Sequence, residues 1–229
     1  MIDIHSHIIT GVDDGASSVA ESAEMLSQAK KAGVGTIIAT PHFNKELYGN
    51  GAVENNFKLA KNEAEKNSIT LLMGYEIKIQ NYPAQMPTDY EGLTLNGSRY
   101  ILLELPFEKV PKYTLDLLYE IQMKKYIPIL AHPERCLKLS REPFLFTEII
   151  EAGCLLQVDA ASIIGANGRK AKRFAKKIIK KGYVSFIASD AHSPVGYSRW
   201  YTKAYKKVQK WIGKQEAEKL FRGEHYFQV

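Results

Sequence analysis

The chain has 229 residues, of which 45% are hydrophobic and 24% charged, and this composition is that of an ordinary soluble protein with one substantial core. No apolar run approaches the length that spans a membrane, and no signal peptide is visible, so we expect one domain over residues 1–229 in the cytoplasm, without direct membrane insertion. The formal net charge of +6 suits an acidic partner, but no base-reading motif accompanies it, so we expect no nucleic-acid partner.

Short apolar runs alternate with longer runs of helical periodicity along the whole chain. Seven strands are predicted, at residues 2–5, 36–40, 69–75, 100–104, 127–131, 154–158 and 184–188. Helices are predicted between and after them, at residues 19–32, 53–66, 111–125, 144–151, 169–182, 200–212 and 215–221. Strands separated by helices favour parallel pairing with right-handed crossovers.

The fold class that follows is α/β, with a sheet that is buried on both faces because its strands are almost continuously apolar. A closed or nearly closed barrel is the first choice, and an open doubly wound sheet is the alternative. Residues 79–98 form the longest irregular stretch, with Pro83, Pro87, Gly92 and Gly97. This stretch is either a loop that faces a substrate or a plain connector.

Histidines and carboxylates gather at the ends of the predicted strands. Alternation along the first strand puts Asp3, His5 and His7 on one face, so the two imidazoles can share an ion. One such histidine is more often a satisfied structural residue. Several independent strands ending this way are hard to explain as packing, since the core would bear several desolvation penalties. The strand-end residues are His5, His7, His42, Glu76, Glu104, His132, Asp159, Asp190 and His192. They predict a site for several metal ions.

Two other features have a plainer interpretation. The basic segment 169–181 reads as an amphipathic helix with a solvated face, and the alternative is attraction to an acidic partner or a membrane-bound complex. Cys136 and Cys154 do not suggest a disulfide framework. Cys136 and Arg141 are too close in sequence for a cysteine-dependent phosphatase loop, and the glycines of such a loop are missing.

Five short motifs, in this order along the chain, carry a family resemblance. They are M-I-D-I-H-S-H with G-V-D-D-G in residues 1–15, T-P-H at 40–42, G-Y-E-I at 74–77, H-P-E-R at 132–135 and S-D-A-H at 189–192. The chain resembles the PHP (polymerase and histidinol phosphatase) superfamily of metal-dependent phosphoesterases. Within it, the chain is similar to the bacterial tyrosine-protein phosphatases of capsule and exopolysaccharide biosynthesis, over nearly its whole length.

The resemblance implies a distorted, TIM-like (β/α)7 barrel that holds three divalent metal ions. Manganese is the usual ion, although iron, cobalt or zinc would suit the same donors. By the family pattern, one ion is held by His5, His7, Glu76 and Asp190. Glu76 bridges to a second ion, which Glu104 and His132 complete. The third is held by Asp14, His42 and His192, with Asp13 next to Asp14 as the alternative.

The resemblance also implies roles at the substrate. Arg135 matches the arginine that grips the substrate phosphate, as a catalytic and substrate-binding residue, and Arg199 is a second candidate although its spacing departs from the family pattern. Aromatic candidates for contact with a phosphotyrosine ring are Phe43, Tyr48, Tyr82, Tyr197 and Trp200. Clustered ions would supply a hydroxide that attacks phosphorus in line, while Arg135 stabilises the equatorial oxygens.

Three functions remain open on the sequence. The first is a tyrosine-protein phosphatase that acts on the tail of a bacterial tyrosine kinase. The second is a small-molecule phosphatase, such as a histidinol-phosphate phosphatase, which would use the same metals. The third is a non-catalytic, metal-stabilised interaction module, which only the basic segment favours.

Overall fold

The computed structural model describes residues 1–49, 51–79, 86–87, 89–223 and 226–227, and within them the strands form two parallel sheets. The first sheet contains β1 (Ile2–Ser6), β2 (Thr36–Ala39) and β3 (Thr70–Met73) in that order. The second contains, also in sequence order, β4 (Glu76–Lys78), β5 (Tyr100–Glu104), β6 (Ile127–Ala131), β7 (Leu155–Asp159) and β8 (Phe186–Ala188). The expected α/β class with parallel strands is confirmed.

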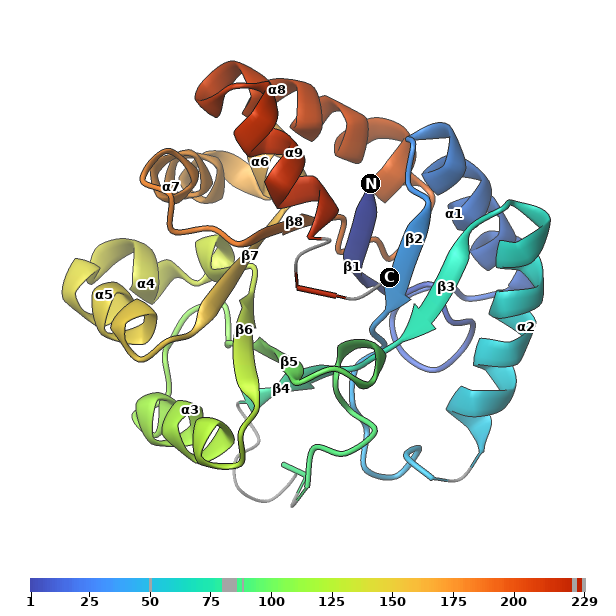
Figure 1. The fold of residues 1–229 in the computed structure, drawn as a ribbon, viewed down its shortest axis with the longest axis horizontal. Helices are drawn as coiled ribbons and strands as arrows, with labels where there is room; N and C mark the ends of the chain where they lie inside the picture. Colours follow the sequence, from blue (N-terminus) through green and yellow to red (C-terminus); the bar gives the residue numbers. More distant parts are fainter. Residues whose placement is uncertain (50, 80–85, 88, 224–225, 228–229) are drawn as a thin grey trace.

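The two sheets are joined to each other at both edges, so the strands form a ring (Figure 1). At one junction, the backbone N–H of His7 donates to the Ala191 carbonyl at 3.0 Å, and that of Asp190 donates to the His5 carbonyl at 3.0 Å. At the other, the N–H of Phe43 donates to the Glu76 carbonyl at 2.8 Å. Bridges of single residue pairs replace full ladders at both junctions, which is the distortion of this ring relative to one continuous barrel sheet.

The segment 69–75, predicted as one strand, is in fact two elements. β3 ends at Met73, and β4 begins at Glu76 in the other sheet. A Cβ at Gly74 would come within 2.7 Å of a Leu95 side-chain carbon and 3.1 Å of the Leu95 Cα, so the close packing of Leu95 favours glycine at this break. The prediction of seven strands was therefore wrong, because the described residues contain eight, and the additional break falls at Gly74.

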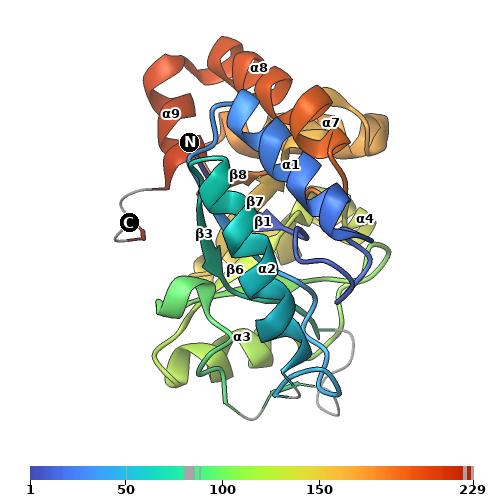
Figure 2. The same ribbon diagram turned by 90° about the vertical axis from the view of Figure 1, so that its right-hand side faces the viewer.

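Helices cover the outside of the ring (Figure 1). They are α1 (Val19–Lys31), α2 (Ala52–Lys66), α3 (Thr114–Met123), α4 (Leu137–Arg141), α5 (Pro143–Glu151), α6 (Ala160–Ile164), α7 (Gly168–Lys180), α8 (Thr202–Ile212) and α9 (Lys214–Arg222). Short single turns add η2 (Leu95–Gly97), η3 (Pro133–Arg135) and the π-helical η4 (Gly196–Tyr201). Helices α1 and α2 lie side by side on one flank (Figure 2). No helix of the described ranges has both the length and the apolar character needed to cross a membrane.

Apolar side chains fill two layers. A large cluster packs the outer faces of the strands against the helices, for example Ile37 and Val158 against Leu26 and Ile178. A smaller cluster takes the alternate strand residues, among them Ile4, Ile38, Leu102 and Ile129, together with Phe227 near the end of the chain. Both layers leave the carboxyl ends of the strands free for polar residues.

Candidate metal centre

Four side chains form the first part of the centre, and they come from the end of β1, the first residue of β4 and the segment after β8. The Nε2 atoms of His5 and His7 lie 3.2 Å apart. Each of these atoms is 3.3 Å from Oε2 of Glu76. Oδ1 of Asp190 is 3.3 Å from the His5 nitrogen and 3.5 Å from the His7 nitrogen. The predicted ligands of the first ion are therefore brought together, all in the interior.

The second group shares Glu76 with the first. Its other carboxylate oxygen, Oε1, lies 3.1 Å from Nε2 of His132, and Oε1 of Glu104 lies 3.9 Å from the same nitrogen. Glu76 thus faces both groups with different oxygens, which is the arrangement that a bridging carboxylate needs.

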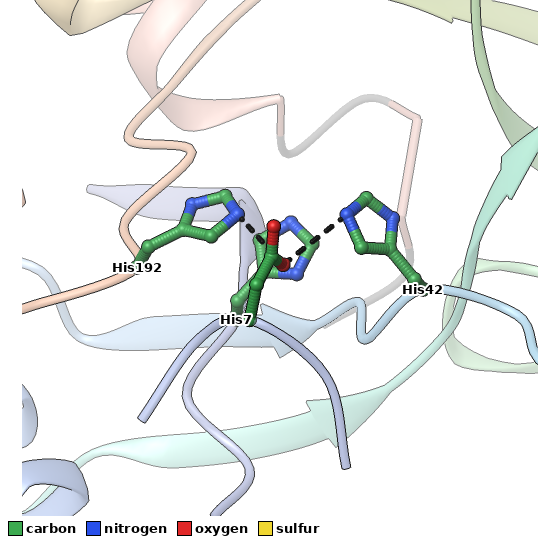
Figure 3. A group of neighbouring side chains, drawn as sticks. His7, His42 and His192 are labelled. Carbon is green, nitrogen blue, oxygen red and sulfur yellow. Dashed lines mark ion pairs between the residues drawn. The ribbon is translucent and has the colours of Figure 1, made fainter. Parts of the chain in front are cut away.

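The third group lies nearer the surface. Oδ1 of Asp14 is 3.3 Å from Nε2 of His42 and 3.3 Å from Nε2 of His192. Figure 3 shows His42 and His192 on either side of His7, whose ring stacks on that of His192 with centroids 3.9 Å apart. The Asp14 side chain is 65% exposed, so this group is open to solvent.

The structure separates the two adjacent aspartates, between which the sequence left a choice. Asp13 turns inward, where its Oδ2 lies 2.7 Å from Nδ1 of His7 and accepts a hydrogen bond from the His42 backbone N–H at 3.0 Å. Asp14 alone reaches the Nε2 atoms of the third group. Asp13 is thus a supporting residue whose hydrogen bond directs Nε2 of His7 toward the cluster.

The donor set fits divalent cations. Ligand-type atoms lie within 4.8 Å of one another in four overlapping sets, which are His7, Asp14, His42 and His192; His5, His7 and Asp190; His5, Glu76 and His132; and His42, Glu76 and Glu104. Three buried atoms of the cluster make no regular hydrogen bond within the part of the chain that the structure describes and have only ion-pair contacts. Nδ1 of His42 lies 3.0 Å from Oε2 of Glu76, Oδ1 of Asp190 lies 3.3 Å from Nε2 of His5, and Oε2 of Glu104 lies 3.8 Å from Nζ of Lys78. Buried polar atoms are normally satisfied, so convergent atoms without hydrogen bonds indicate a place for cations.

Two residues that support the first group were not predicted from the sequence to have this role. Nδ1 of His5 lies 3.0 Å from Oε1 of Gln157, and the Gln157 amide donates to Oδ1 of Asp159 at 3.1 Å. These two consecutive hydrogen bonds hold the His5 proton on Nδ1 and leave Nε2 free for the cluster. The available signal was a glutamine inside an otherwise apolar strand, whereas Asp159 had been noted only as a strand-end carboxylate.

Asp3 does not join the cluster, contrary to the simple alternation expected for the first strand. The β1–β2 register shifts between Asp3 and Ser6, and Asp3 turns toward η4. Its carboxylate accepts hydrogen bonds from the Tyr197 hydroxyl at 2.7 Å and the Ser189 N–H at 2.9 Å. Asp3 is fully buried and holds the start of the chain to the segment after β8.

Without cations, the charged groups of the cluster shift the pKa values of one another. Burial alone would lower the pKa of His5, but the facing carboxylates of Glu76 and Asp190 raise it to about 9. Burial likewise opposes the charge on His132, while Asp159 and Glu76 raise its pKa to about 10. Burial and the neighbouring Glu76 raise the pKa of Glu104. Strongly shifted groups of both kinds in one place are typical of a functional site.

Two residues of the cluster adopt left-handed backbone conformations directly after their strands. His132 has φ +32° and Asp190 has φ +47°. Such conformations cost about 1–2 kcal/mol for residues with a Cβ, and they persist where a function requires them. Here they turn the two side chains from the strand direction into the centre.

Arg135 borders the cluster. Its Nη1 lies 2.8 Å from Oδ2 of Asp190 and 3.4 Å from Oδ2 of Asp159, and its guanidinium stacks over the Phe107 ring at 4.3 Å. Arg199 lies on η4 with its side chain exposed, and none of its atoms contacts the cluster in the described structure.

Of the aromatic candidates for substrate contact, some lie beside the cluster and others do not. A cavity of about 770 Å³ beside Asp14 and His42 is also lined by Phe43, Lys45 and Lys78. Phe43 packs against Tyr48, with ring centroids 5.5 Å apart. Tyr197 is fully buried and bonded to Asp3, so its proposed contact with substrate was wrong, and Trp200 packs against the core. Tyr82 lies outside the described residues.

The match to known proteins covers almost the whole chain. The family model described as capsular polysaccharide synthesis, CpsB/CapC, matches residues 1–225. This chain belongs to the CpsB/CapC family. The resemblance expected from the motifs is thereby confirmed.

Relatives of the CpsB/CapC chain have informative names. The tyrosine-protein phosphatase YwqE of Bacillus subtilis is 39% identical over 200 residues, which cover 84% of this chain and 78% of YwqE. The tyrosine-protein phosphatase CpsB of Streptococcus agalactiae serotype III is 30% identical over 230 residues, which cover 96% of this chain and 95% of CpsB.

Solved structures give the same fold. A crystal structure from work on YwqE of Bacillus subtilis and CpsB of Streptococcus pneumoniae, described as unique metal-dependent tyrosine phosphatases, matches with a TM-score of 0.83 and 36% identity. It covers 96% of this chain and 91% of that one. Histidinol phosphate phosphatase of Lactococcus lactis, with zinc, L-histidinol and phosphate, matches at TM-score 0.54 and 10% identity over 94% of this chain and 93% of that one, which concerns the fold alone.

Proposed function

We propose that this CpsB/CapC chain is a metal-dependent tyrosine-protein phosphatase. The observation that carries the proposal is the meeting of histidines and carboxylates from several strand ends in one cluster beside Arg135. The names of relatives that are 30% to 39% identical support it.

The proposed ligand sets are those of the three groups. His5, His7, Glu76 and Asp190 would hold one cation, and Glu76, Glu104 and His132 a second. Asp14, His42 and His192 would hold a third. We favour manganese because mixed imidazole and carboxylate donors suit it, although the same donors accept iron, cobalt and zinc. Such cations lower the pKa of water and so supply a nucleophile near neutral pH.

Residues of the chain itself bind and orient the phosphate. The Arg135 guanidinium has donors in a fixed plane, so it can bind phosphate oxygens while Asp190 and Asp159 hold its position. Its stacking on Phe107 limits its movement. A tyrosine leaving group has a pKa near 10, so it departs without the full protonation that a serine alkoxide requires. Arg199 stays a weaker candidate, since it would have to reach the phosphate from an exposed position.

Neither cysteine is suited to act as the nucleophile. Burial raises the pKa of Cys154 to about 12, and burial raises the pKa of Cys136 as well. Both side chains are therefore thiols at neutral pH, and thiols are poor nucleophiles. Thiol alkylation is accordingly expected to leave the phosphatase active.

The wider setting is also a proposal. By the capsule-related names of its relatives, the substrate would be a phosphotyrosine protein of polysaccharide synthesis, such as a bacterial tyrosine kinase. A single catalytic domain over residues 1–229 and a cytoplasmic location remain predictions from the sequence.

The test is a comparison of substrates with purified, manganese-loaded protein. Phosphate release is measured from a phosphotyrosine peptide, from the matching phosphoserine peptide and from histidinol phosphate. We expect the phosphotyrosine peptide to react fastest, and we expect a chelator to abolish the reaction. Faster hydrolysis of histidinol phosphate would support the small-molecule alternative instead, and no hydrolysis by fully loaded protein would support the interaction module.

A further inference from the structure

Helices α7 and α8 concentrate the positive charge of the molecule. α7 contains seven lysines and arginines, α8 contains four, and neither helix contains an acidic residue. The whole chain has 31 basic and 25 acidic residues, so the rest has 20 basic against 25 acidic. The positive net charge therefore belongs to these two helices, which we call the α7–α8 basic face.

The two helices also hold like charges close together. Lys207 of α8 is half-buried, and its burial and the nearby ammonium groups of Lys172 and Lys176 lower its pKa. Among the residues that the structure describes, no carboxylate forms an ion pair with a lysine or arginine of α7 or α8. Adjacent cations without a counter-charge repel one another, and a bound polyanion would relieve this repulsion.

α7 has no apolar surface to insert into a lipid bilayer. On α8, Trp211 and Ile212 are partly exposed, and Nζ of Lys176 lies over the Trp211 ring, 5.5 Å from its centroid. The apolar residues of α7, among them Phe174, Ile178 and Ile179, are buried against the ring. What α7 presents to solvent is charge alone, which suits an acidic polypeptide better than a membrane into which a helix must sink its apolar side.

The basic face starts at the candidate active site. A cavity of about 460 Å³ is lined by Phe107 and Arg135 on one side and by Arg169 and Lys170, in the first turn of α7, on the other. Glu108 and Glu134 also line it, so the positive charge becomes uninterrupted only along α7 itself. Further basic residues follow at intervals of three or four, which places them on successive turns of one stripe.

We propose that the α7–α8 basic face is a docking surface for an acidic segment of the phosphoprotein substrate, engaged while a phosphotyrosine of the same polypeptide occupies the metal centre. This inference rests on the proposed phosphatase function. α7 has 13 residues and is about 20 Å long. An extended peptide spans that length with about six residues. Binding at both places raises the local concentration of the phosphotyrosine, and complementary charge speeds the encounter.

The test compares two phosphotyrosine peptides on manganese-loaded protein at low salt. One has a block of six glutamates joined to the phosphotyrosine by a short neutral linker, on either side, and the other has six glutamines in the same places. We expect the native protein to prefer the glutamate peptide by roughly three- to tenfold in kcat/KM, through a lower KM. The variant K172Q/K176Q/K207Q is expected to lose this preference while kcat on the glutamine peptide is unchanged.

A matched control removes three lysines on the other flank of the ring. Lys31, Lys58 and Lys61 are exposed on α1 and α2, so K31Q/K58Q/K61Q changes the net charge equally and should keep the preference. The proposal is overturned if the native protein shows no preference, if the α7–α8 variant retains it, or if the control loses it equally. Should the triple variant not fold, K176Q alone is tested. We expect it to lose part of the preference for the glutamate peptide, and full retention of that preference would count against the proposal.

A binding measurement separates this inference from the proposed function. Fluorescence anisotropy of a labelled, unphosphorylated glutamate peptide should show binding by the native protein. The variant K172Q/K176Q/K207Q should bind more weakly. Salt at 0.5 M should also weaken binding, because it shortens the Debye length to about 4–5 Å and screens the charges. If no peptide is hydrolysed, the phosphatase proposal fails while this result still decides the docking surface. Binding to phosphatidylglycerol vesicles, lost in the same variant, without binding of the peptide would assign the face to membranes and overturn the proposal.

Discussion

Single side chains decide which imidazole nitrogen faces the candidate metals. Nδ1 of His5 contacts Gln157 and Nδ1 of His7 contacts Asp13, so both Nε2 atoms are left for the cluster. The ligand types could be predicted from sequence because strand ends carried them. Asp13 and Gln157 could not be assigned this supporting role, since neither has a fixed spacing from the histidine it contacts.

A ligand can be removed at this scale without disturbing the core. Replacing Glu104 by alanine should lower turnover roughly 100-fold, because the second group would lose a carboxylate that no neighbour replaces. The melting temperature of the metal-free protein should be nearly unchanged. Glu104 lies at the end of β5, and burial raises the pKa of its carboxyl, so the folded state gains nothing from its charge. Steady-state kinetics with a phosphotyrosine peptide measures the effect. Glu108→Ala, at an exposed position nearby, is the control, and equal losses in both would argue against the ligand assignment.

The buried pair Tyr197–Asp3 provides a test of stability. Tyr197→Phe leaves Oδ2 of Asp3 without its hydroxyl donor in the interior, which should lower the free energy of unfolding by about 1–3 kcal/mol. Tyr201→Phe is a matched control, because the Tyr201 hydroxyl is equally buried but lies 3.3 and 3.5 Å from two carbonyl oxygens. Urea unfolding of both variants measures the difference. A larger loss for Tyr201→Phe would contradict the role given to Asp3.

At the scale of elements, the loop after β1 brings both adjacent aspartates to the cluster. Its close approach depends on Gly15, whose N–H donates to Asp13 at 2.9 Å. A Cβ at this position would collide with the backbone of His7. The requirement for glycine at this position explains the D-D-G motif in physical terms.

Gly15→Ala is therefore expected to move the loop and to separate Asp14 from His42 and His192. Turnover should fall, and one equivalent of bound metal should be lost, as measured by elemental analysis of the purified protein. The cost in stability should be about 1–3 kcal/mol because the collision involves backbone. Gly35→Ala is the control, since nothing lies within 4 Å of its added Cβ. An unchanged metal content in Gly15→Ala would show that the loop does not carry a ligand.

Periodicity along the sequence predicted most elements and missed a few. Most strands and helices were placed within a few residues, because their apolar periods are long and clear. The break between β3 and β4 was missed, since Gly74 and Tyr75 sit inside an apolar run whose two halves pair in different sheets. α6 was also missed, because five residues are too few for a helical period to appear.

For the whole molecule, the cluster links stability to pH and to metal. In the cation-free protein, the pKa values of His5 and His132 are raised from 6.5 to about 9 and about 10. A raised pKa contributes stability that is complete below pH 6.5 and is lost as the pH rises through the folded value. Glu76 and Asp190, with lowered pKa values, stay ionised throughout this range and add no change.

We therefore expect the melting temperature of the chelated protein to fall between about pH 6.5 and pH 10. Manganese should reverse this fall, because cations bind the neutral imidazoles and bind only the folded state. Differential scanning calorimetry with and without manganese measures both effects. Metal uptake at pH 7 should also release protons, which titration calorimetry detects in two buffers of different ionisation enthalpy. A melting temperature that is independent of both pH and manganese would contradict a metal centre.

By itself, the sequence determined the α/β class, most element positions and the residue types of the centre, because apolar periods and strand-end motifs are local properties of a chain. Only the tertiary structure decided that the ring closes through single bridges, that Asp13 supports while Asp14 faces the third group, and that Asp3 turns away from the histidines. These outcomes depend on register and on contacts between residues far apart in the chain. The register shift in β1 and the bridges between the two sheets join residues far apart in the chain, and no pattern along the chain encodes them.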